Sequence, residues 1–497
     1  MNRCFKHSRL PSSERPGKIL VLLAVLFPVI LSLLGLVLDG SILMFERRRL
    51  QQATDAAATA AALELQRGGT TAAAAAKATE MIQSLNGFGD ATVQVNIHPA
   101  TGPYAGNARY AEVLVSRQPQ TYFVRFMGQQ SAQQVSTRAV AGTEDATADA
   151  AVLVLDPDPP GILLTGLPIT IPALPSTHLG GLECLGLGQL QVEDAVLVNT
   201  EWGGVNEDGD LLGTLDELRY AIRCMPILPL TKLRAEDVRV VGGVDNERNF
   251  GNIDLDEPSP LQTNRMPVED PLIDLPVPTV FSDSENVVAA ERGGKTLINI
   301  PILGTPIVLK PGVYEWINVV TGPVIFEPGV YVVRGVHPVS QIALNLTAGP
   351  VSAEGVMFYI TNNEDYSVTL GEPDASDGET NPGNYGVPSH VPSVVIDGAV
   401  FGNTFSPLSD PGSPYDGMFL FQRRTDRRPI VLVGEQLLGS GTMAGRIYAK
   451  WGHVIFAGHG TYDLAFAAGS VRFVNVLRCT LRPSNPFPPA QDVYLVE

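Results

Sequence analysis

The sequence predicts a membrane-anchored protein with an N-terminal α+β part, a long helix plus a small pilin-like sheet, followed by a large all-β region. Three observations lead to this fold class. Residues 19–38 form an uncharged apolar run, a helical pattern with an alanine-rich face continues to residue 67, and short apolar runs separated by Gly and Pro fill the rest. The 497-residue chain has room for two or three domains, and its 49 Gly and 39 Pro indicate many turns.

The charge of the chain is uneven. Its formal net charge of -18 would repel a phosphate backbone, so we expect no nucleic-acid partner. The first 18 residues are the exception, because they hold five basic residues against the single acid Glu14: Arg3, Lys6, Arg9, Arg15 and Lys18. We therefore predict a basic cytoplasmic leader over residues 1–18.

Residues 19–38 are predicted to be a transmembrane helix, with membrane lipid as its partner. Twenty residues at about 1.5 Å each span a hydrocarbon core of roughly 30 Å. A signal peptide is the alternative, but no small-x-small cleavage site follows Leu38, so an uncleaved anchor is favoured. Five basic residues before the span, against three in 47–49 after it, place the N-terminus inside and the body in the periplasm or outside the cell.

The helical pattern is expected to continue beyond the membrane. Leu43, Leu50 and Ala57 are spaced by seven residues, and no Gly or Pro interrupts the pattern before Gly68. Alanine buries little area, which argues against a coiled-coil stalk, but an alanine face lets a sheet or another helix approach closely. We expect such a sheet to pack on this helix.

Residues 39–142 are predicted to be this helical stalk and the pilin-like α+β unit. A helix over 70–85 closes at Asn86-Gly87, and the alternating segments 91–97, 109–116 and 132–142 read as strands. A short apolar helix is expected around 121–128, between the last two strands. Residues 143–150 then form a linker.

The N-terminal residues, about 140 in number, resemble a known family, and the match is densest over about 50 of them. They combine a basic leader, an apolar span with Pro28, the spacing Gly-x-x-x-Asp at Gly35 and Asp39, and an arginine group. A Leu-Gln-x-Ala-x-Asp-Ala-Ala element then stands at Leu50, Gln51, Ala53, Asp55, Ala56 and Ala57. This pattern resembles the TadE/TadG-like Flp (tight-adherence) pilus assembly proteins. Processed pilin-like members carry a glutamate early in the span; Leu22 stands there, which is similar to the TadG branch.

The resemblance implies a function. It indicates a non-enzymatic, single-pass protein of a bacterial cytoplasmic membrane that contributes to Flp/Tad pilus assembly or surface adherence. Other pilus assembly or secretion components are the implied partners, and cell-envelope polysaccharide is a further candidate. The alternative is a membrane-tethered β-solenoid that acts on or binds polysaccharide.

Residues 151–482 are predicted to be the β-rich domain, with a C-terminal tail at 483–497. The pairs Pro311-Gly312 and Pro328-Gly329 each precede Val-Tyr and lie 17 residues apart, and related apolar runs recur downstream. Such turns and spacings favour a parallel β-solenoid, with a β-sandwich of hairpins as the alternative. A short amphipathic helix is expected at 214–225.

No catalytic, cofactor-binding or metal-binding residue is predicted. Asp156 ends an apolar strand, but prolines replace the serines that a von Willebrand A metal site needs. Asn199-Thr200-Glu201 and Gly458-His459-Gly460 resemble pectinase fragments without their paired aspartates. The segments 206–211 and 252–258 read as solvated acidic turns rather than calcium loops, and the basic cluster 423–428 as a solvated loop.

The four cysteines are too few for a disulfide framework. Outside the cytoplasm, Cys184 and Cys224 are the pair best placed by sequence to form a bridge. The alternative is three separate buried thiols at positions 184, 224 and 479.

Overall fold

The computed structural model of the chain describes most residues and divides them into two compact units. The described residues are 16–123, 133–160, 180–186, 188–212, 219–226, 233–279, 291–299, 305–363, 365–367, 369–371, 382, 391–400, 402–435, 442–474 and 478–497. The first unit comprises residues 1–144 and 491–497, and the second comprises residues 145–490. The second unit is therefore inserted into the sequence of the first.

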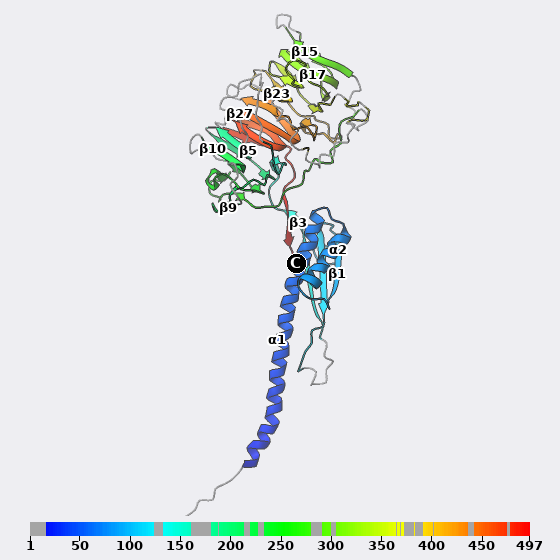
Figure 1. The fold of residues 1–497 in the computed structure, drawn as a ribbon, viewed down its shortest axis with the longest axis vertical. Helices are drawn as coiled ribbons and strands as arrows, with labels where there is room; N and C mark the ends of the chain where they lie inside the picture. Colours follow the sequence, from blue (N-terminus) through cyan, green and yellow to red (C-terminus); the bar gives the residue numbers. More distant parts are fainter. Residues whose placement is uncertain are drawn as a thin grey trace, which may run out of the picture. The chain divides into compact units, whose positions relative to one another are not determined.

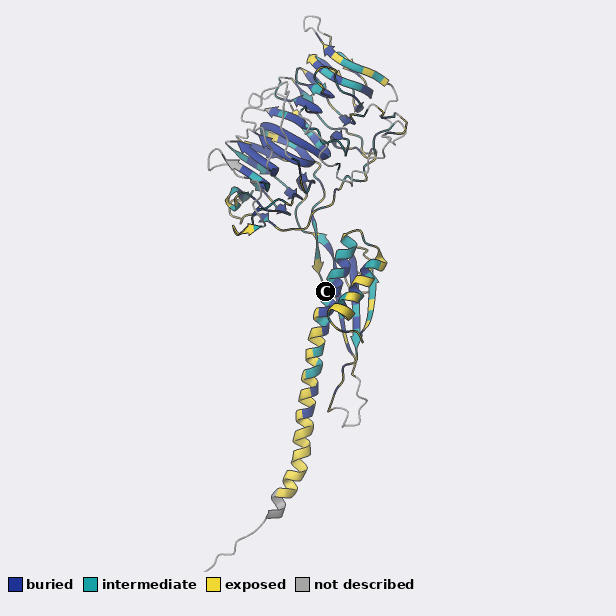
Figure 2. Ribbon diagram, in the orientation of Figure 1, coloured by how far each residue is buried: buried dark blue, intermediate teal, exposed yellow. Residues whose placement is uncertain are grey.

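A single long helix dominates the first unit. Helix α1 (Pro16–Gln66) has 51 residues and ends just before Gly68, whose φ of 75° only glycine adopts readily. Its apolar side chains from Leu20 to Leu38 are exposed, as the yellow stretch in Figure 2 shows. Among the described residues, α1 is the one helix long and apolar enough to cross a membrane.

A second, shorter helix follows as predicted. Helix α2 (Thr71–Glu80) continues into the π-helical turn η1 (Met81–Leu85). The Thr70 hydroxyl accepts the Ala73 N–H at 3.2 Å and caps the first turn. Gly87 follows with a φ of 72°, so the predicted stop is confirmed.

The sheet of the first unit has four strands in the order β1-β2-β3-β29. They are β1 (Thr92–Ile97), β2 (Tyr110–Arg117), β3 (Val135–Asp145) and β29 (Gln491–Leu495). The pairs β1–β2 and β2–β3 are antiparallel, and the three predicted strands are confirmed. The residues expected as a tail instead supply the fourth strand.

An alanine-rich core joins the helices to this sheet, as expected from the alanine face. Its buried members on the helices include Ala53, Ala57, Ala61, Ala74 and Ala78. The strands contribute Ala111, Val113, Val115, Ala139 and Ala141. Small side chains on both surfaces let the helices and the sheet approach closely, which compensates for the small area that each alanine buries.

The second unit is the large all-β region that the sequence predicts. Its first strands are β4 (Ala150–Val154), β5 (Gly180–Gly186), β6 (Gln189–Val192), β7 (Ala195–Val198), β8 (Gly204–Val205), β9 (Leu211–Leu212), β10 (Tyr220–Pro226), β11 (Leu233–Ala235), β12 (Val238–Val240), β13 (Phe250–Asn252) and β14 (Leu261–Gln262), with a 3₁₀ turn at Glu247–Asn249.

The later strands of this unit follow after residue 290. They are β15 (Glu291–Ile298), β16 (Ile307–Leu309), β17 (Gly312–Thr321), β18 (Val324–Phe326), β19 (Gly329–Val333), β20 (Leu344–Leu346), β21 (Val351–Ala353), β22 (Val356–Ile360), β23 (Val394–Asp397), β24 (Thr404–Phe405), β25 (Met418–Gln422), β26 (Ile430–Glu435), β27 (Thr442–Val474) and β28 (Arg478–Leu481).

These strands pair in parallel, in ladders that run through many strands (Figure 1). One ladder contains β15, β17, β20, β23, β26 and β27, a second β17, β19, β22, β25 and β27, and a third β16, β18, β21, β24 and β27. The hairpins of the sandwich alternative would pair antiparallel, whereas among the described strands of this unit only the short pair β8–β9 does. The glycines of the 17-residue repeat begin β17 and β19, which are paired neighbours.

The two groups of strands in this unit, β4 to β14 and β15 to β28, pair with each other. Strand β27 pairs with β4 and β5, and β28 pairs with β6, so the last strands of the unit lie beside its first. From β4 the parallel pairing continues through β7 and β12 to β14. A connecting segment, described over residues 263–279, then leads to β15.

Inside the second unit, aromatic side chains stack from strand to strand. Phe326 lies 5.4 Å from Phe358 between ring centroids, and Phe358 lies 5.8 Å from Phe419. Both pairs are edge-to-face, an arrangement that adds stabilisation beyond the area buried. The three residues come from β18, β22 and β25, so the core repeats across neighbouring strands.

Two predicted helices are not found where the sequence placed them. Residues 220–225 belong to strand β10, while 213–218 lie outside the described residues. The prediction was wrong for 220–225 because β5 offers a complete parallel hydrogen-bonding partner, which overrides a helical apolar spacing. In the expected helix at 121–128, residues 121–123 are not helical and 124–128 lie outside the described residues.

Candidate functional site on the long helix

Two residues interrupt the exposed surface of the apolar part of α1. From residue 20 to residue 40, Gly35 and Asp39 are buried and every other residue is exposed. They are four residues apart and therefore lie on one face of the helix. The same two residues form the Gly-x-x-x-Asp spacing of the sequence.

Asp39 holds a loop that follows β2. Its carboxylate accepts the backbone N–H of Tyr122 at 3.0 Å and that of Phe123 at 2.7 Å, one on each oxygen. The Asp39 side chain is fully buried, and hydrogen bonds to a carboxylate are stronger than those between neutral groups. A fully buried aspartate on an otherwise exposed apolar helix therefore has a structural partner.

Gly35 makes room for the same loop. A Cβ atom at this position would lie 2.5 Å from Cγ of Phe123, closer than real Cβ contacts occur. Only glycine therefore allows the Phe123 ring to cover the helix here. We call Gly35, Asp39, Tyr122 and Phe123 the clasp.

A basic and aromatic cluster lies further along α1. Arg117 pairs with Glu46 at 2.8 Å and with Asp90 at 2.9 Å. The guanidinium groups of Arg117 and Arg49 lie 5.3 and 5.2 Å from the centroid of the Phe88 ring. The hydrogen bond from Arg117 lowers the pKa of Asp90.

Polar side chains also connect α1 to β3. The Gln51 amide donates to the Arg138 carbonyl oxygen at 3.0 Å, and the hydroxyls of Thr54 and Thr137 lie 2.6 Å apart. Thr54 and Thr137 are buried, so this contact satisfies polar groups inside the alanine core. Gln51 belongs to the sequence element that carries the family resemblance.

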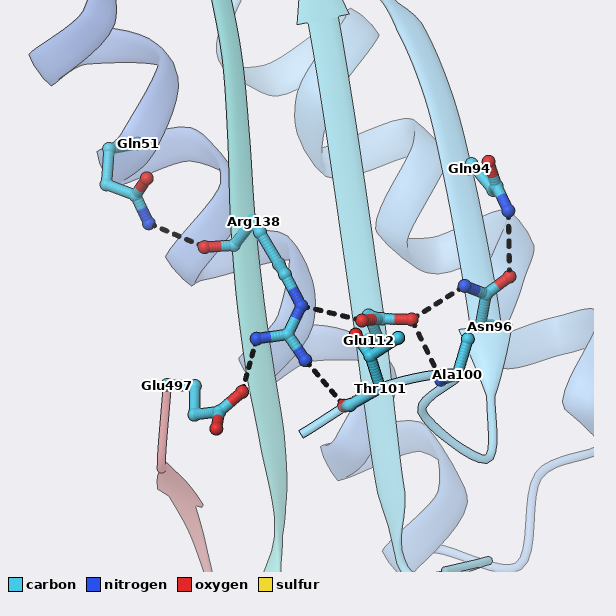
Figure 3. Close-up of polar contacts among 8 residues, drawn as sticks. All are labelled: Gln51, Gln94, Asn96, Ala100, Thr101, Glu112, Arg138 and Glu497. Atoms are coloured by element: carbon cyan, nitrogen blue, oxygen red, sulfur yellow. Dashed lines mark hydrogen bonds and ion pairs between the residues drawn. The ribbon is translucent and has the colours of Figure 1, made fainter. Parts of the chain in front are cut away.

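The opposite face of the sheet carries a network around Glu112 (Figure 3). This carboxylate accepts from Asn96 at 2.7 Å, from the Ala100 N–H at 3.1 Å and from Arg138 at 2.7 Å. Burial raises the pKa of Glu112, but these three hydrogen bonds outweigh it and leave the pKa below its usual value. Arg138 also pairs with Glu497, so the network ties residues beyond β29 to β2 and β3.

In the second unit, the basic cluster at 423–428 is not the solvated loop that the sequence predicted. Arg427 pairs with the fully buried Asp156 at 2.8 Å, and Arg424 donates to the Tyr448 hydroxyl at 3.0 Å. Arg424 also donates to the Leu272 carbonyl at 2.8 Å. The prediction was wrong because acceptors distant in the sequence, invisible to local composition, surround these guanidinium groups.

Asp156 and the first of the two pectinase-like fragments have structural partners. Burial raises the pKa of Asp156, while the Arg427 charge opposes that shift. The Asn199 amide exchanges two hydrogen bonds with the backbone of Val268, and the Thr200 hydroxyl donates to the Asp156 carbonyl. These contacts place Asn199 and Thr200 in the packing between strands and the connecting segment.

Both acidic segments contain turns held by side-chain hydrogen bonds. Asn206 accepts the N–H groups of Asp208 and Asp210, and Asp254 accepts that of Asp256, so both are side-chain-capped turns. Within the described part of the chain, no group of three His, Cys, Asp or Glu side chains has the arrangement of a metal site.

The three cysteines among the described residues are free thiols. Cys184 on β5 lies directly opposite Cys224 on β10, and both are buried, as is Cys479. This matches the alternative of three buried thiols. The hydrogen bond that the Cys224 thiol makes with Cys184, together with burial, raises the pKa of Cys224, so this thiol stays protonated and unreactive.

The sequence identified Gly35, Asp39 and Gln51 but not their partners. Residues 121–123 read as the start of an apolar helix, and Glu112, Arg138 and Glu497 read as ordinary strand or tail residues. The sequence did contain a usable signal. Two aromatic residues, Tyr122 and Phe123, follow a predicted strand and Pro119, and the apolar helix contains one isolated aspartate, Asp39.

Comparison with known proteins agrees with the sequence resemblance. Residues 17–67 match the family described as putative Flp pilus-assembly TadE/G-like. The matched stretch includes Gly35, Asp39 and Gln51. No curated protein and no solved structure matches the chain.

Proposed function

We propose that the chain is a non-enzymatic, single-pass envelope protein of the TadE/G-like type, which contributes to Flp/Tad pilus assembly or surface adherence. The family match over residues 17–67 supports a pilus-related envelope protein. The structural roles of Asp156, Asn199 and Thr200 support the non-enzymatic part, because these side chains already bind protein partners.

One observation carries the proposal. The matched stretch 17–67 nearly coincides with α1, Pro16–Gln66, whose first half is apolar and exposed and whose second half packs on a sheet. Exposed leucines around the whole helix are unfavourable in water and favourable in lipid. The helix thus has the surface of an anchor at one end and of a folded domain at the other.

The proposed orientation has the N-terminus in the cytoplasm. The basic residues of the leader favour this side, and the second unit then lies in the periplasm or outside the cell. There it presents a large surface to other pilus assembly or secretion components.

In this proposal the second unit is a parallel β-solenoid. The three ladders with a common strand direction, and the aromatic residues that repeat from β18 to β22 to β25, support this architecture. An experimental structure in which these strands form antiparallel hairpins would contradict it.

Fractionation with protease protection tests the anchor and its direction. We expect the full chain to stay with the membrane after a high-pH wash, and external protease to digest the second unit in spheroplasts. Digestion in intact cells as well would place this unit outside the cell, and protection there would place it in the periplasm. A second unit that is protected in spheroplasts and digested only after lysis would contradict the orientation.

A genetic test addresses the pilus itself. In a source cell that makes Flp pili, deletion of the gene should abolish surface pilin, and the intact gene should restore it. A chain whose residues 1–40 are replaced by a cleavable signal peptide should not restore pilin, because it lacks the anchor. Normal piliation of the deletion strain would contradict the role in pilus assembly.

A further inference from the structure

The clasp places an aromatic side chain beside the apolar part of the anchor. Phe123 contacts α1 at Gly35, which lies three residues before Leu38, the end of the apolar run. At about 1.5 Å per residue, this is about 4.5 Å inside the apolar end. A helix tilt of about 20° moves a group on the helix surface by only about 2 Å along the bilayer normal. Tilt therefore does not bring Phe123 out of the hydrocarbon region.

Two backbone donors of the loop have the partner that a bilayer requires. A backbone N–H group without a partner in the hydrocarbon region costs several kcal/mol. The N–H groups of Tyr122 and Phe123 both donate to Asp39, which is itself buried. Helix α1 therefore supplies the acceptor for both N–H groups of the loop at the depth at which water is lost.

The side chains suit the membrane interface. Tyr122 is 62% exposed and Phe123 is 40% exposed, although both are large and aromatic. Tyrosine is favoured where one end of the ring meets acyl chains and the hydroxyl meets the head groups. The exposed apolar surface of α1 from Leu20 to Leu38 continues directly into this pair.

We propose that residues 122 and 123 enter the non-cytoplasmic leaflet beside α1, so that the first unit contacts the bilayer at two points. This inference rests on the proposed function, because it takes α1 as the anchor. The partner is the boundary between lipid acyl chains and head groups. A helix alone leaves the unit free to rotate about the helix axis, whereas a second contact fixes which face of the sheet turns toward the membrane.

Depth-dependent quenching of tryptophan fluorescence tests this contact in the full chain. Tyr122→Trp and Phe123→Trp are compared in vesicles of phosphatidylethanolamine and phosphatidylglycerol, with or without bromine on the acyl chains. The emission of the three native tryptophans is subtracted with the unsubstituted chain. We expect a blue-shifted added emission that is lost most strongly when bromine lies near the carbonyl end of the acyl chain.

Two further variants control for depth. Phe27→Trp replaces an exposed residue near the middle of the apolar run and should be quenched most by bromine near the methyl end. Leu85→Trp replaces an exposed residue close in sequence to Phe88, which contacts Arg49. Arg49 lies 11 residues after Leu38, about 16 Å beyond the apolar end, so Leu85→Trp should not be quenched.

The outcomes separate the inference from the proposed anchor. If Phe27→Trp is quenched but neither clasp variant is, the anchor stands and the bilayer contact is refuted. This is the result expected if the aromatic pair binds another protein in the cell instead of lipid. If Phe27→Trp is not quenched, both the anchor and the inference fail. Tyr122→Trp serves if the larger ring at position 123 disturbs the contact with Gly35, because the Tyr122 side chain is mostly exposed.

Discussion

At the scale of residues, the first unit relies on buried carboxyl groups that receive N–H donors from distant segments. Asp39 binds a loop more than 80 positions away, and Glu112 binds Ala100 and Arg138. Removing one partner of such a contact leaves a buried polar group unsatisfied, which costs about 1–3 kcal/mol. These residues therefore determine which segments stay together.

The clasp predicts different effects for two neighbouring glycines of α1. Gly35→Ala places a Cβ against the Phe123 ring, whereas a Cβ at Gly40 meets nothing within 4 Å. We expect Gly35→Ala to weaken the loop contact by on the order of 1–2 kcal/mol and Gly40→Ala to leave it unchanged. The measurement is the rate at which a protease cuts between residues 117 and 124 in the solubilised full chain; equal rates for both variants would refute the clasp.

The free energy of unfolding should depend on pH through Asp245. Burial raises the pKa of Asp245 to about 7. Because the folded state then holds a proton that the unfolded state loses above about pH 4, the free energy of unfolding falls as the pH rises from about 4 to about 7. Above about pH 7 the carboxyl group is ionised in both the folded and the unfolded state, so Asp245 no longer makes the free energy of unfolding change with pH.

Asp245→Asn removes this titration while keeping an oxygen to accept the Cys224 N–H. We expect the variant to gain on the order of 1–3 kcal/mol relative to the unsubstituted chain between pH 4 and pH 8. Denaturant unfolding at both pH values measures the difference. A difference between the two proteins that does not change with pH would show that Asp245 does not titrate in this range.

At the scale of elements, the helices of the first unit depend on small residues. Ala78 of α2 is fully buried in the alanine core, whereas Ala76 on the same helix is exposed. A larger side chain at position 78 has no space, and overpacking of this kind costs about 1–3 kcal/mol. At position 76 the same side chain meets solvent.

Ala78→Leu should therefore destabilise the first unit by about 1–3 kcal/mol, and Ala76→Leu should change its stability by less than about 0.5 kcal/mol. Leucine and alanine are both good helix formers, so helix propensity contributes little to the difference. Denaturant unfolding in detergent, followed by a probe in the first unit, compares the two variants. Similar losses for both would mean that α2 does not pack as described.

Elements defined by local patterns could be predicted from the sequence, and those defined by distant partners could not. The end of α1, helix α2 and strands β1 to β3 follow from period, caps and alternation within a few residues. Strand β10 was missed because its pairing with β5 decides its state, and β29 because its partner β3 lies about 350 positions earlier. The clasp follows the same rule, since Asp39 was visible and its loop was not.

At the scale of the whole molecule, the second unit is an insertion between β3 and β29. The Ala146 N–H donates to the Ala490 carbonyl at 2.8 Å, so the two ends of the inserted segment lie side by side. Domains whose ends are adjacent are tolerated as insertions and can be removed with little disturbance. The fold of the first unit therefore needs β29 but not the residues between.

This topology predicts opposite results for two deletions. Replacing residues 147–489 by a short Gly-Ser turn keeps β29 and the partner of Arg138, so we expect the shortened chain to fold and keep the network around Glu112. Ending the chain at residue 145 removes β29 and Glu497, which exposes an edge of β3 and leaves Arg138 without one of its carboxylates. Hydrogen exchange of the β3 amides measures both: protection should persist in the first variant and fall by at least about tenfold in the second, where a loss of about 1.4 kcal/mol suffices. Equal protection of β3 in the two variants would show that β29 is dispensable and that the first unit is complete before the insertion begins.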